Sequence, residues 1–290
     1  MRVLLMGYHE GELEAQRRAG VAAAAARLER LPRAEMPPAA QQFVAAQSLA
    51  IVASTDAGGR LWASALSGAP GFLRAVDERT LVARARPAPG DPLRDNLEHD
   101  AAVGLLIIDP PARRRMRVNG HARWIDDAQL EVVTDEVYAN CPKYIQRREP
   151  DIASPPSAGA ARRAPELTRE ARALIAAADT LFSATRHPGR GADASHRGGE
   201  AGFVQVARDA DGTDVLRIPD YAGNNMFNTL GNLMVEPRAG LLVLDFERGG
   251  ALQLTGTGEV RWDGAAREVA FRVDEAVELP GALGHRWRSL

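Results

Sequence analysis

A polar segment in the second half of the chain carries residue types that could bind an anion and move a proton. Asp193 to Gly199 combines a hydroxyl, an imidazole and a guanidinium with two glycines. Serine is a short donor, arginine offers a planar fork for phosphate, and glycine lets backbone N–H groups approach a ligand closely. We therefore expect Ser195, His196, Arg197 and Gly198 to bind an anion. His196 is also the candidate proton donor, because histidine titrates near neutral pH.

A second donor-rich segment follows at Gly223 to Thr229, with Asn225, Asn228 and Thr229 as neutral donors. The matching stretches in the first half of the chain, Ser64 to Gly68 and Gly90 to Leu93, lack the histidine and the arginine. Asp91 would repel an anion there. An anion is therefore expected to choose the second half. The alternative is that the Ser-His-Arg-Gly-Gly run is only a well-capped surface loop.

Two further cations could reach the same ligand. Strand alternation places Arg115 and Arg117 on one face, which would suit a phosphate or an acidic substrate. The alternative is a solvated strand edge. Metal chemistry is not expected, because His187 and His196 lack ligand spacing and Cys141 is the single cysteine.

The elements that position these residues occur twice. Residues 43–124 and 178–262 carry the same sequence landmarks in the same order. Three pairs show it: Gly71-Phe72-Leu73 with Gly202-Phe203-Val204, Asn96-Leu97 with Asn232-Leu233, and Gly104-Leu105-Leu106 with Gly240-Leu241-Leu242. A period this long is one domain copied, since solenoid units are nearer ~20–50 residues.

Each copy is dominated by short apolar or alternating runs, which predict strands. The expected strands are Leu49–Ser54, Thr80–Arg84, Val103–Ile108, Arg115–Trp124, Thr180–Thr185, Val215–Ile218, Gly240–Phe246 and Ala251–Trp262. A short helix is expected around each Asn-Leu pair. Strands at this spacing with one small helix indicate a compact antiparallel barrel in each copy.

Helical sequence lies outside the copies. We expect helices over Glu10–Arg30, over Asp127–Gln146 with a bend at Pro142, and over Glu166–Ala178. The expected domains are an N-terminal helical extension (1–42), a first barrel with a helical tail (43–149), a linker rich in Pro, Ala and Gly (150–165) and a second barrel (166–290).

Composition narrows the class of protein. A net charge of -2 argues against a nucleic-acid partner. No apolar run approaches the ~18 residues of a membrane span, and the apolar start is too brief for a signal peptide. We expect a soluble, cytoplasmic protein with no membrane partner.

These segments together resemble a known family. Tyr8 to Glu12, Arg113 to Gly120, Asn140 to Gln146, Asp193 to Gly199 and Asn225 to Leu233 carry the resemblance. The chain is similar to the pyridoxamine 5'-phosphate oxidase-like flavoproteins, in particular to the two-barrel branch of predicted flavin-nucleotide-binding proteins. The resemblance implies a mainly β fold with flanking helices, a tandem repeat of two FMN-binding split β-barrels, with FMN held non-covalently between them.

The resemblance also implies site roles. The stretch before the small helix commonly supplies Ser, Arg or Lys to the phosphate; here it holds Asn228 and Thr229, so Arg197 would supply the charge. Lys143 and Tyr144 would meet the flavin edge, or else serve as a helix-end cation and a packed aromatic. The first copy would add a wall through Trp62 to Gly68, including Ser67.

The implied activity is FMN-dependent electron or hydride transfer to an unidentified small molecule, with NAD(P)H as one candidate substrate and a homodimer as one candidate assembly. Trp287-Arg288 matches the oxidase's C-terminal substrate motif poorly, so oxidation of vitamin B6 is not expected. The alternatives are a non-catalytic flavin-binding carrier or sensor, and a deazaflavin- or haem-handling split barrel.

Overall fold

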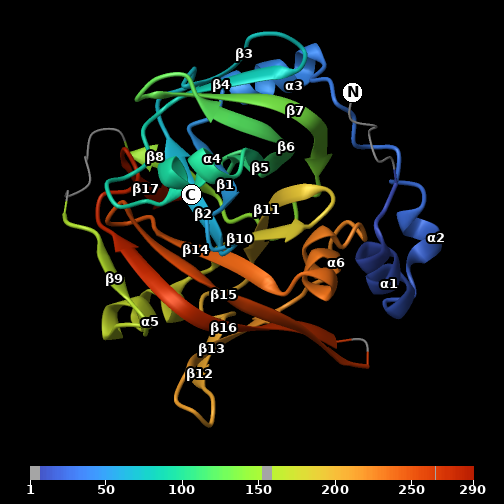
Figure 1. The fold of residues 1–290 in the computed structure, drawn as a ribbon, viewed down its shortest axis with the longest axis vertical. Coiled ribbons are helices and arrows are strands. Elements are labelled where there is room, and N and C mark those ends of the chain that lie inside the picture. The colour runs from blue at the N-terminus through green and yellow to red at the C-terminus, as the bar shows by residue number, and fades with distance from the viewer. Residues whose placement is uncertain (1–6, 152–158, 265) are drawn as a thin grey trace.

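The structure, a computed structural model, describes residues 7–151, 159–264 and 266–290. Two large antiparallel sheets lie one above the other (Figure 1). The first has the strand order β2-β1-β5-β6-β7-β4-β3 and the second β11-β10-β14-β15-β16-β13-β12, with β9 paired to β16. The two orders correspond strand by strand. The expected tandem of two split β-barrels is therefore confirmed.

The first barrel comprises β1 (Leu49–Thr55), β2 (Leu61–Ser67), β3 (Leu73–Ala75), β4 (Thr80–Arg84), α4 (Leu93–His99), β5 (Ala102–Asp109), β6 (Arg114–Trp124) and β7 (Gln129–Asn140). The second comprises α5 (Arg169–Ala177), β10 (Thr180–His187), β11 (Gly191–Gly198), β12 (Gln205–Arg208), β13 (Asp214–Pro219), α6 (Asn228–Val235), β14 (Arg238–Asp245), β15 (Gly250–Asp263) and β16 (Ala266–Leu279). Every strand predicted from the sequence lies within one of these, apart from Phe246.

Two predicted elements were wrong. The helix expected over Asp127–Gln146 is wrong: Gln129–Asn140 forms the strand β7, whose Val-rich run alternates between the core and the outside over its first half. Its acidic start belongs to the turn after β6, not to a helix N-terminus. The alternative of a surface loop around Ser195 also fails, because Gly191–Gly198 is the strand β11 paired along its length with β10.

The barrels share a core of their own. An apolar cluster formed by both copies includes Trp62 and Ile51 from the first and Phe182 and Leu242 from the second. β5 contacts β11, and β14 contacts β2, so the central strands cross at a pseudo-twofold axis. A Cβ at Gly104 would lie 2.5 Å from the carbonyl oxygen of Ala192. Glycine is needed there because the two backbones touch.

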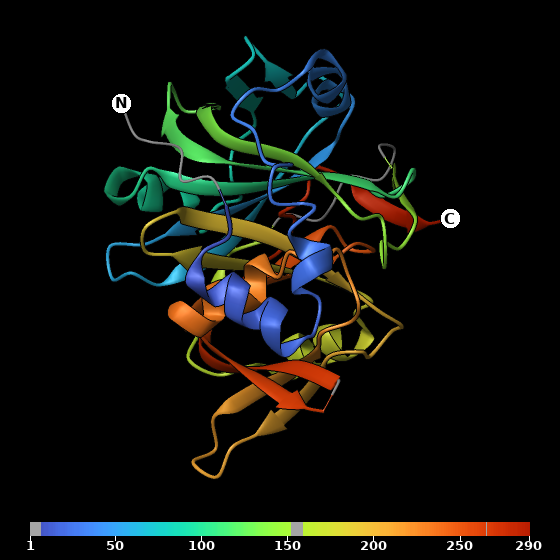
Figure 2. The same ribbon diagram turned by 90° about the vertical axis from the view of Figure 1, so that its right-hand side faces the viewer.

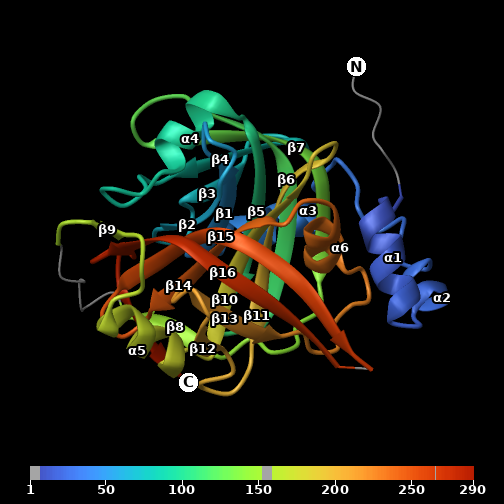
Figure 3. The same ribbon diagram turned by 60° about the horizontal axis from the view of Figure 1, so that its bottom comes forward.

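The N-terminal extension is docked on the second barrel. The expected helix over Glu10–Arg30 is split into α1 (Glu10–Arg18) and α2 (Ala22–Ala25), with Gly20 between them at φ 69°. α1 lies against α6, outside the sheets (Figures 2 and 3). A Cβ at Gly11 would lie 2.1 Å from the Gly231 carbonyl oxygen, so this contact also depends on glycine. α3 (Pro38–Ala45) packs instead on β3 of the first barrel.

Further strands flank the connection between the barrels. β8 (Arg148–Asp151) pairs with β17 (Arg286–Ser289) near the C-terminus, and β9 (Arg162–Ala164) pairs with β16. Residues 152–158 of the expected linker lie outside the described residues, and the domain boundaries stay a prediction. No helix in the described part of the chain is long and apolar enough to cross a membrane.

Candidate functional site

A cavity between the two barrels collects most of the predicted site residues. Its volume is about 100 Å³, and it is partly open to solvent. β6 and the segment after β7 form its first-barrel wall, and β11, the loop before α6 and the start of α6 form the other. The predicted residues that line it are Arg115, Arg117, Lys143, Tyr144, Ser195, His196, Arg197, Gly198, Asn225, Asn228 and Thr229.

Two predicted wall residues lie elsewhere. Ser67 ends β2 on the opposite side of the pseudo-twofold, where its Oγ accepts a hydrogen bond from the Gly284 amide at 2.8 Å. Trp62 is fully buried between the barrels. The first barrel therefore contributes to the cavity through Arg115 and Arg117 rather than through the β2 segment.

Arg115 is a half-buried cation without a counter-ion among the described residues. Its Nη1 donates to Nδ1 of His196 at 2.6 Å, while its Nε is buried without a hydrogen-bond partner. Within the described ranges no carboxylate pairs with it. Burial, reinforced by the neighbouring Arg117 and Arg197, lowers the pKa of Arg115 to about 10. A buried charge is costly unless it is paired, so this guanidinium favours an anionic ligand in the cavity.

Arg117, in contrast, has a carboxylate partner and is held by protein groups through both terminal nitrogens, although its Nε is also buried without a partner. It donates to the Tyr138 hydroxyl at 2.9 Å, to Asp193 at 3.2 Å and to the Ser195 hydroxyl. The hydroxyl of Thr229 also donates to Ser195 Oγ, at 3.0 Å. With two donors on its oxygen, the Ser195 hydroxyl has its own hydrogen left for an acceptor in the cavity.

Arg197 faces the cavity with its charge already compensated. It forms an ion pair with Asp220, whose other oxygen accepts from Arg267 Nε at 2.9 Å. Two guanidinium groups thus share one carboxylate. The sequence assigned the phosphate charge to Arg197, but the geometry makes Arg115 the stronger candidate.

His196 is held as a neutral donor. Burial, with Arg115 and Arg197 nearby, lowers its pKa well below the usual value. Because Nδ1 accepts from Arg115, the proton sits on Nε2, which is buried without a partner. The ring can therefore donate a hydrogen bond to a ligand. A role as the proton donor, expected from the sequence, would require a charged form that this environment disfavours.

The start of α6 adds backbone donors. Its N-cap, Phe227, has a left-handed backbone (φ 63°) and makes no side-chain cap, while Asn228 and Thr229 of the first turn line the cavity. Uncapped N–H groups at a helix N-terminus attract anions. Asn225 and Tyr144, also on the cavity wall, share the rare positive φ (64° and 65°). Such backbone strain clusters at functional sites.

The rim is aromatic. The rings of Tyr144 and Tyr221 lie 5.3 Å apart, tilted by 37°, and both are exposed. The Tyr144 hydroxyl and Lys143 Nζ both donate to the carbonyl of Ala222. A Cβ at Gly198 would lie 2.1 Å from the Tyr144 carbonyl oxygen, so this glycine accommodates the loop rather than a ligand.

Sequence reasoning missed several wall residues, notably Asp220, Tyr221 and Arg267. Tyr221 lies in a polar loop, and an aromatic residue in such a loop could have been taken as a sign of a binding site. Nothing in the sequence pointed to Asp220 and Arg267. They form an ion pair between the end of β13 and the start of β16, which are far apart in the sequence and meet only in the folded chain.

The first barrel has a closed counterpart of this site. Equivalent strand registers place Ser64 where the second barrel has Ser195, and Gln253 where the first barrel has Arg117. Ser64 Oγ donates to Asp91 at 2.7 Å, and Gln253 Nε2 donates to Asp91 at 2.9 Å. Burial raises the pKa of Asp91 to about 6. A carboxylate of the chain occupies the place where the other site offers donors.

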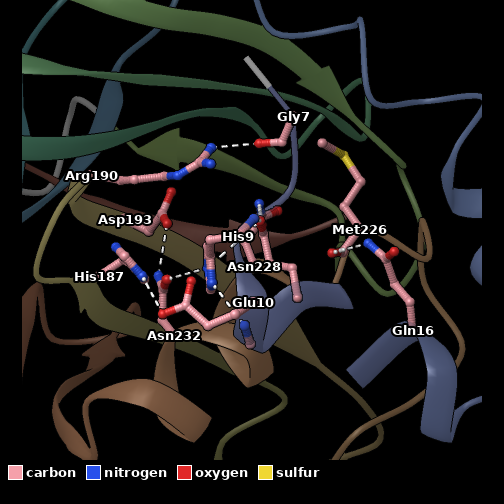
Figure 4. Close-up of polar contacts among 12 residues, drawn as sticks. Gly7, His9, Glu10, Gln16, His187, Arg190, Asp193, Met226, Asn228 and Asn232 are labelled. Atoms are coloured by element: carbon pink, nitrogen blue, oxygen red, sulfur yellow. Dashed lines mark hydrogen bonds and ion pairs between the residues drawn. The ribbon is translucent and has the colours of Figure 1, made fainter. Parts of the chain in front are cut away.

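A metal centre has weak support. His9, Glu10 and His187 offer three ligand atoms within 4.8 Å of one another. Both ring nitrogens of each histidine are already in use, however. Those of His9 contact Gly11 N and Asn232, and those of His187 contact Gly189 N and Glu10 (Figure 4). A metal would have to displace these bonds, so we assign none.

The sequence of the first barrel matches the model of a known protein family. Residues 36–157 match the family model described as Pyridoxamine 5'-phosphate oxidase. A search of curated protein sequences finds no match.

Several solved structures are similar to part of the chain. HupZ of Group A Streptococcus is 15% identical, covering 36% of this chain and 94% of its own, with a TM-score of 0.30. A putative pyridoxamine 5'-phosphate oxidase from Lactobacillus delbrueckii is 16% identical (39% and 94% covered, TM-score 0.31). HutZ, the heme storage protein from Vibrio cholerae, is 12% identical (40% and 96% covered, TM-score 0.28). These scores are too low to say anything about a ligand. The family match covers residues 36–157, so this part of the chain, which contains the first barrel, is similar to the pyridoxamine 5'-phosphate oxidase family.

Proposed function

We propose that the cavity between the barrels binds FMN and that the protein is a flavin-dependent oxidoreductase acting on a small molecule. The observation that carries the proposal is Arg115, a half-buried guanidinium with no carboxylate partner among the described residues, beside an uncapped helix N-terminus. Such a site needs an anion, and a phosphate supplies charge and acceptor oxygens together.

The donors fit a phosphate. Arg115 Nε and His196 Nε2 are buried donors without partners, and Ser195 has a hydrogen to give. Asn228 and Thr229 would present the first amides of α6. These groups would hold the phosphate, while Tyr144 and Tyr221 offer flat surfaces on which an aromatic ring could stack.

FMN, when bound, would supply the electron or hydride transfer, and the chain would bind, orient and shield it. His196 would donate a hydrogen bond from Nε2 and keep its ring neutral. Arg117 would hold Ser195 and Asp193 in place, because it donates hydrogen bonds to both and to the Tyr138 hydroxyl.

The purified protein is expected to be yellow, with the absorbance of oxidised flavin, or to become so when FMN is added. Bleaching by NADH or NADPH without air, then reoxidation by air, would support turnover. Stable yellow protein that no reductant bleaches would indicate a carrier or sensor. A Soret band, or binding of a deazaflavin in preference to FMN, would contradict the proposal.

We expect one FMN per chain after reconstitution with excess flavin. The counterpart site has Ala251 and Gln253 where the cavity has Arg115 and Arg117, and Asp91 would repel a phosphate there. Equilibrium dialysis against FMN measures the stoichiometry. Two equivalents of similar affinity per chain would contradict the assignment to one cavity.

A further inference from the structure

A second cavity lies next to the first, under the segment that leads into α1. It has a volume of about 50 Å³ and is lined by the Gly7–Glu12 segment, β7, β11 and α6. Asn228 lines both cavities, so the two sites are neighbours. Figure 4 shows His9, Asp193 and Asn232 meeting beneath this segment.

Carboxyl groups dominate the lining. Glu12, Glu29, Glu136 and Asp193 face the cavity, against Arg190 as the one cationic side chain among the described lining residues. Burial, with the Asp193 charge adding to it, raises the pKa of Glu12 to about 7 and also raises that of Glu136. Arg117 pairs with Asp193 from the side of the first cavity, which leaves Glu12 and Glu136 as buried carboxyl groups with no ion pair to an arginine or lysine among the described residues.

His9 does not supply that charge. Burial lowers its pKa to about 4, so the ring is neutral at physiological pH. Its Nδ1 accepts from the Gly11 amide at 3.2 Å, and its Nε2 donates to Asn232 Oδ1 at 3.0 Å. Both nitrogens are therefore spent on positioning the segment before α1.

Asn119 gives an independent sign that a donor belongs in the cavity. Its side chain is only 7% exposed, and its Nδ2 donates to Asp193 at 2.7 Å and to Glu136 at 3.2 Å. Two carboxylates on Nδ2 fix the orientation of the amide. Its Oδ1 is buried without a partner, and Asn119 is one of the residues that line the cavity. Leaving a buried acceptor unmatched destabilises the folded protein, so a donor bound there would be favoured.

We propose that this cavity binds a small ammonium ion, either free or as the head of a short primary amine. An ammonium group carries one positive charge and several N–H donors, which match the carboxylates and the Asn119 oxygen. The volume of about 50 Å³ suits a group of this size, since one water needs ~10–15 Å³. The site does not depend on the flavin proposal.

Calorimetric titration of the flavin-free full chain at pH 8, where Glu12 is charged, tests the proposal. The titrants are ammonium chloride and methylammonium chloride, with tetramethylammonium chloride holding the ionic strength constant as a donor-free cation. We expect saturable binding of at least one of the two donors. Ammonium alone would indicate the free ion, and both would indicate the amine head group.

Glu136→Gln keeps the acceptor for Asn119 and removes one charge, so we expect binding to weaken by about 10-fold or more. Glu131→Gln on the same strand is the control, because Glu131 pairs with Arg123 away from the cavity. Glu12→Gln is the second variant if the first does not fold. Heats no larger than those of dilution, or unchanged affinity in a folded Glu136 or Glu12 variant, would overturn the proposal. Flavin binding could survive either result.

Discussion

Replacing Arg115 by methionine is expected to weaken FMN binding by about 2–3 kcal/mol, or ~30- to 150-fold. Arg115 is half-buried, its Nε is buried without a partner, and its Nη1 donates to His196. A phosphate would therefore gain a charge-assisted hydrogen bond that no protein carboxylate competes for. Fluorescence titration of FMN measures the change.

The stability of the flavin-free protein separates binding from folding. Methionine preserves much of the volume and removes an uncompensated charge, so the free energy of unfolding should hold or rise. Arg115→Lys should restore part of the affinity. Arg114→Met is the matched control, since Arg114 is exposed and pairs with Asp109.

Arg197→Ala gives the contrast with the expectation from sequence. Because Asp220 already compensates Arg197, we expect a smaller loss of affinity than for the Arg115 variant. Equal affinity of the Arg115→Met variant and the unmodified protein would remove Arg115 from the site. A larger loss for the Arg197 variant would restore the sequence assignment.

The fold was readable from the sequence because the chain repeats itself. Matching landmarks in two copies located corresponding strands in each, and the resemblance to a known family implied the tandem of split barrels whose strand order the structure shows. The error at β7 arose from a local signal: acidic residues at the start of a segment favour a helix N-terminus but also occur in hairpin turns. The Val-rich alternation over the first half of Gln129–Asn140 was the better guide.

The sequence indicated which side chains line the cavity, but not which of its arginines are paired with a carboxylate. Side chains along β6, β11 and the start of α6 line one cavity, as residue chemistry suggested. Which arginine keeps its charge for a ligand depends on Asp220, a residue 23 positions from Arg197 whose contact only the folded chain reveals. The cavity under α1 was hidden for the same reason, since it joins Glu12 to Asn228 across 216 positions.

The closed counterpart site leads to a prediction about stability. Asp91→Asn is expected to stabilise the protein relative to the unmodified chain by about 2–3 kcal/mol more at pH 7.5 than at pH 4. The pKa of Asp91 is raised from 3.8 to about 6 in the folded state. Its contribution to stability is therefore complete below about pH 4 and is lost as the pH rises through about 6. Asparagine does not ionise, so it escapes this loss.

The contacts of Asp91 explain why asparagine can be tolerated. Its Oδ1 accepts from Ser64 and from the Leu93 amide, which an asparagine oxygen can also do. The new amide nitrogen would face Nε2 of Gln253, so the hydrogen bond from Gln253 to residue 91 would be lost at both pH values, while Nε2 keeps its bonds to Ala63 and Ser64. Urea unfolding of both proteins at the two pH values measures the difference. Asp95→Asn, on the exposed face of α4, should show no such pH dependence.

The same substitution tests whether Asp91 alone closes the counterpart site. Even without the carboxylate, Ala251 and Gln253 leave that site without the cations that Arg115 and Arg117 give to the cavity. We therefore expect the Asp91→Asn variant still to bind one FMN per chain. A second equivalent of bound FMN would mean that charge repulsion by Asp91, rather than the missing cations, keeps phosphate out. A pH-independent stability difference would mean that Asp91 titrates normally in the folded protein.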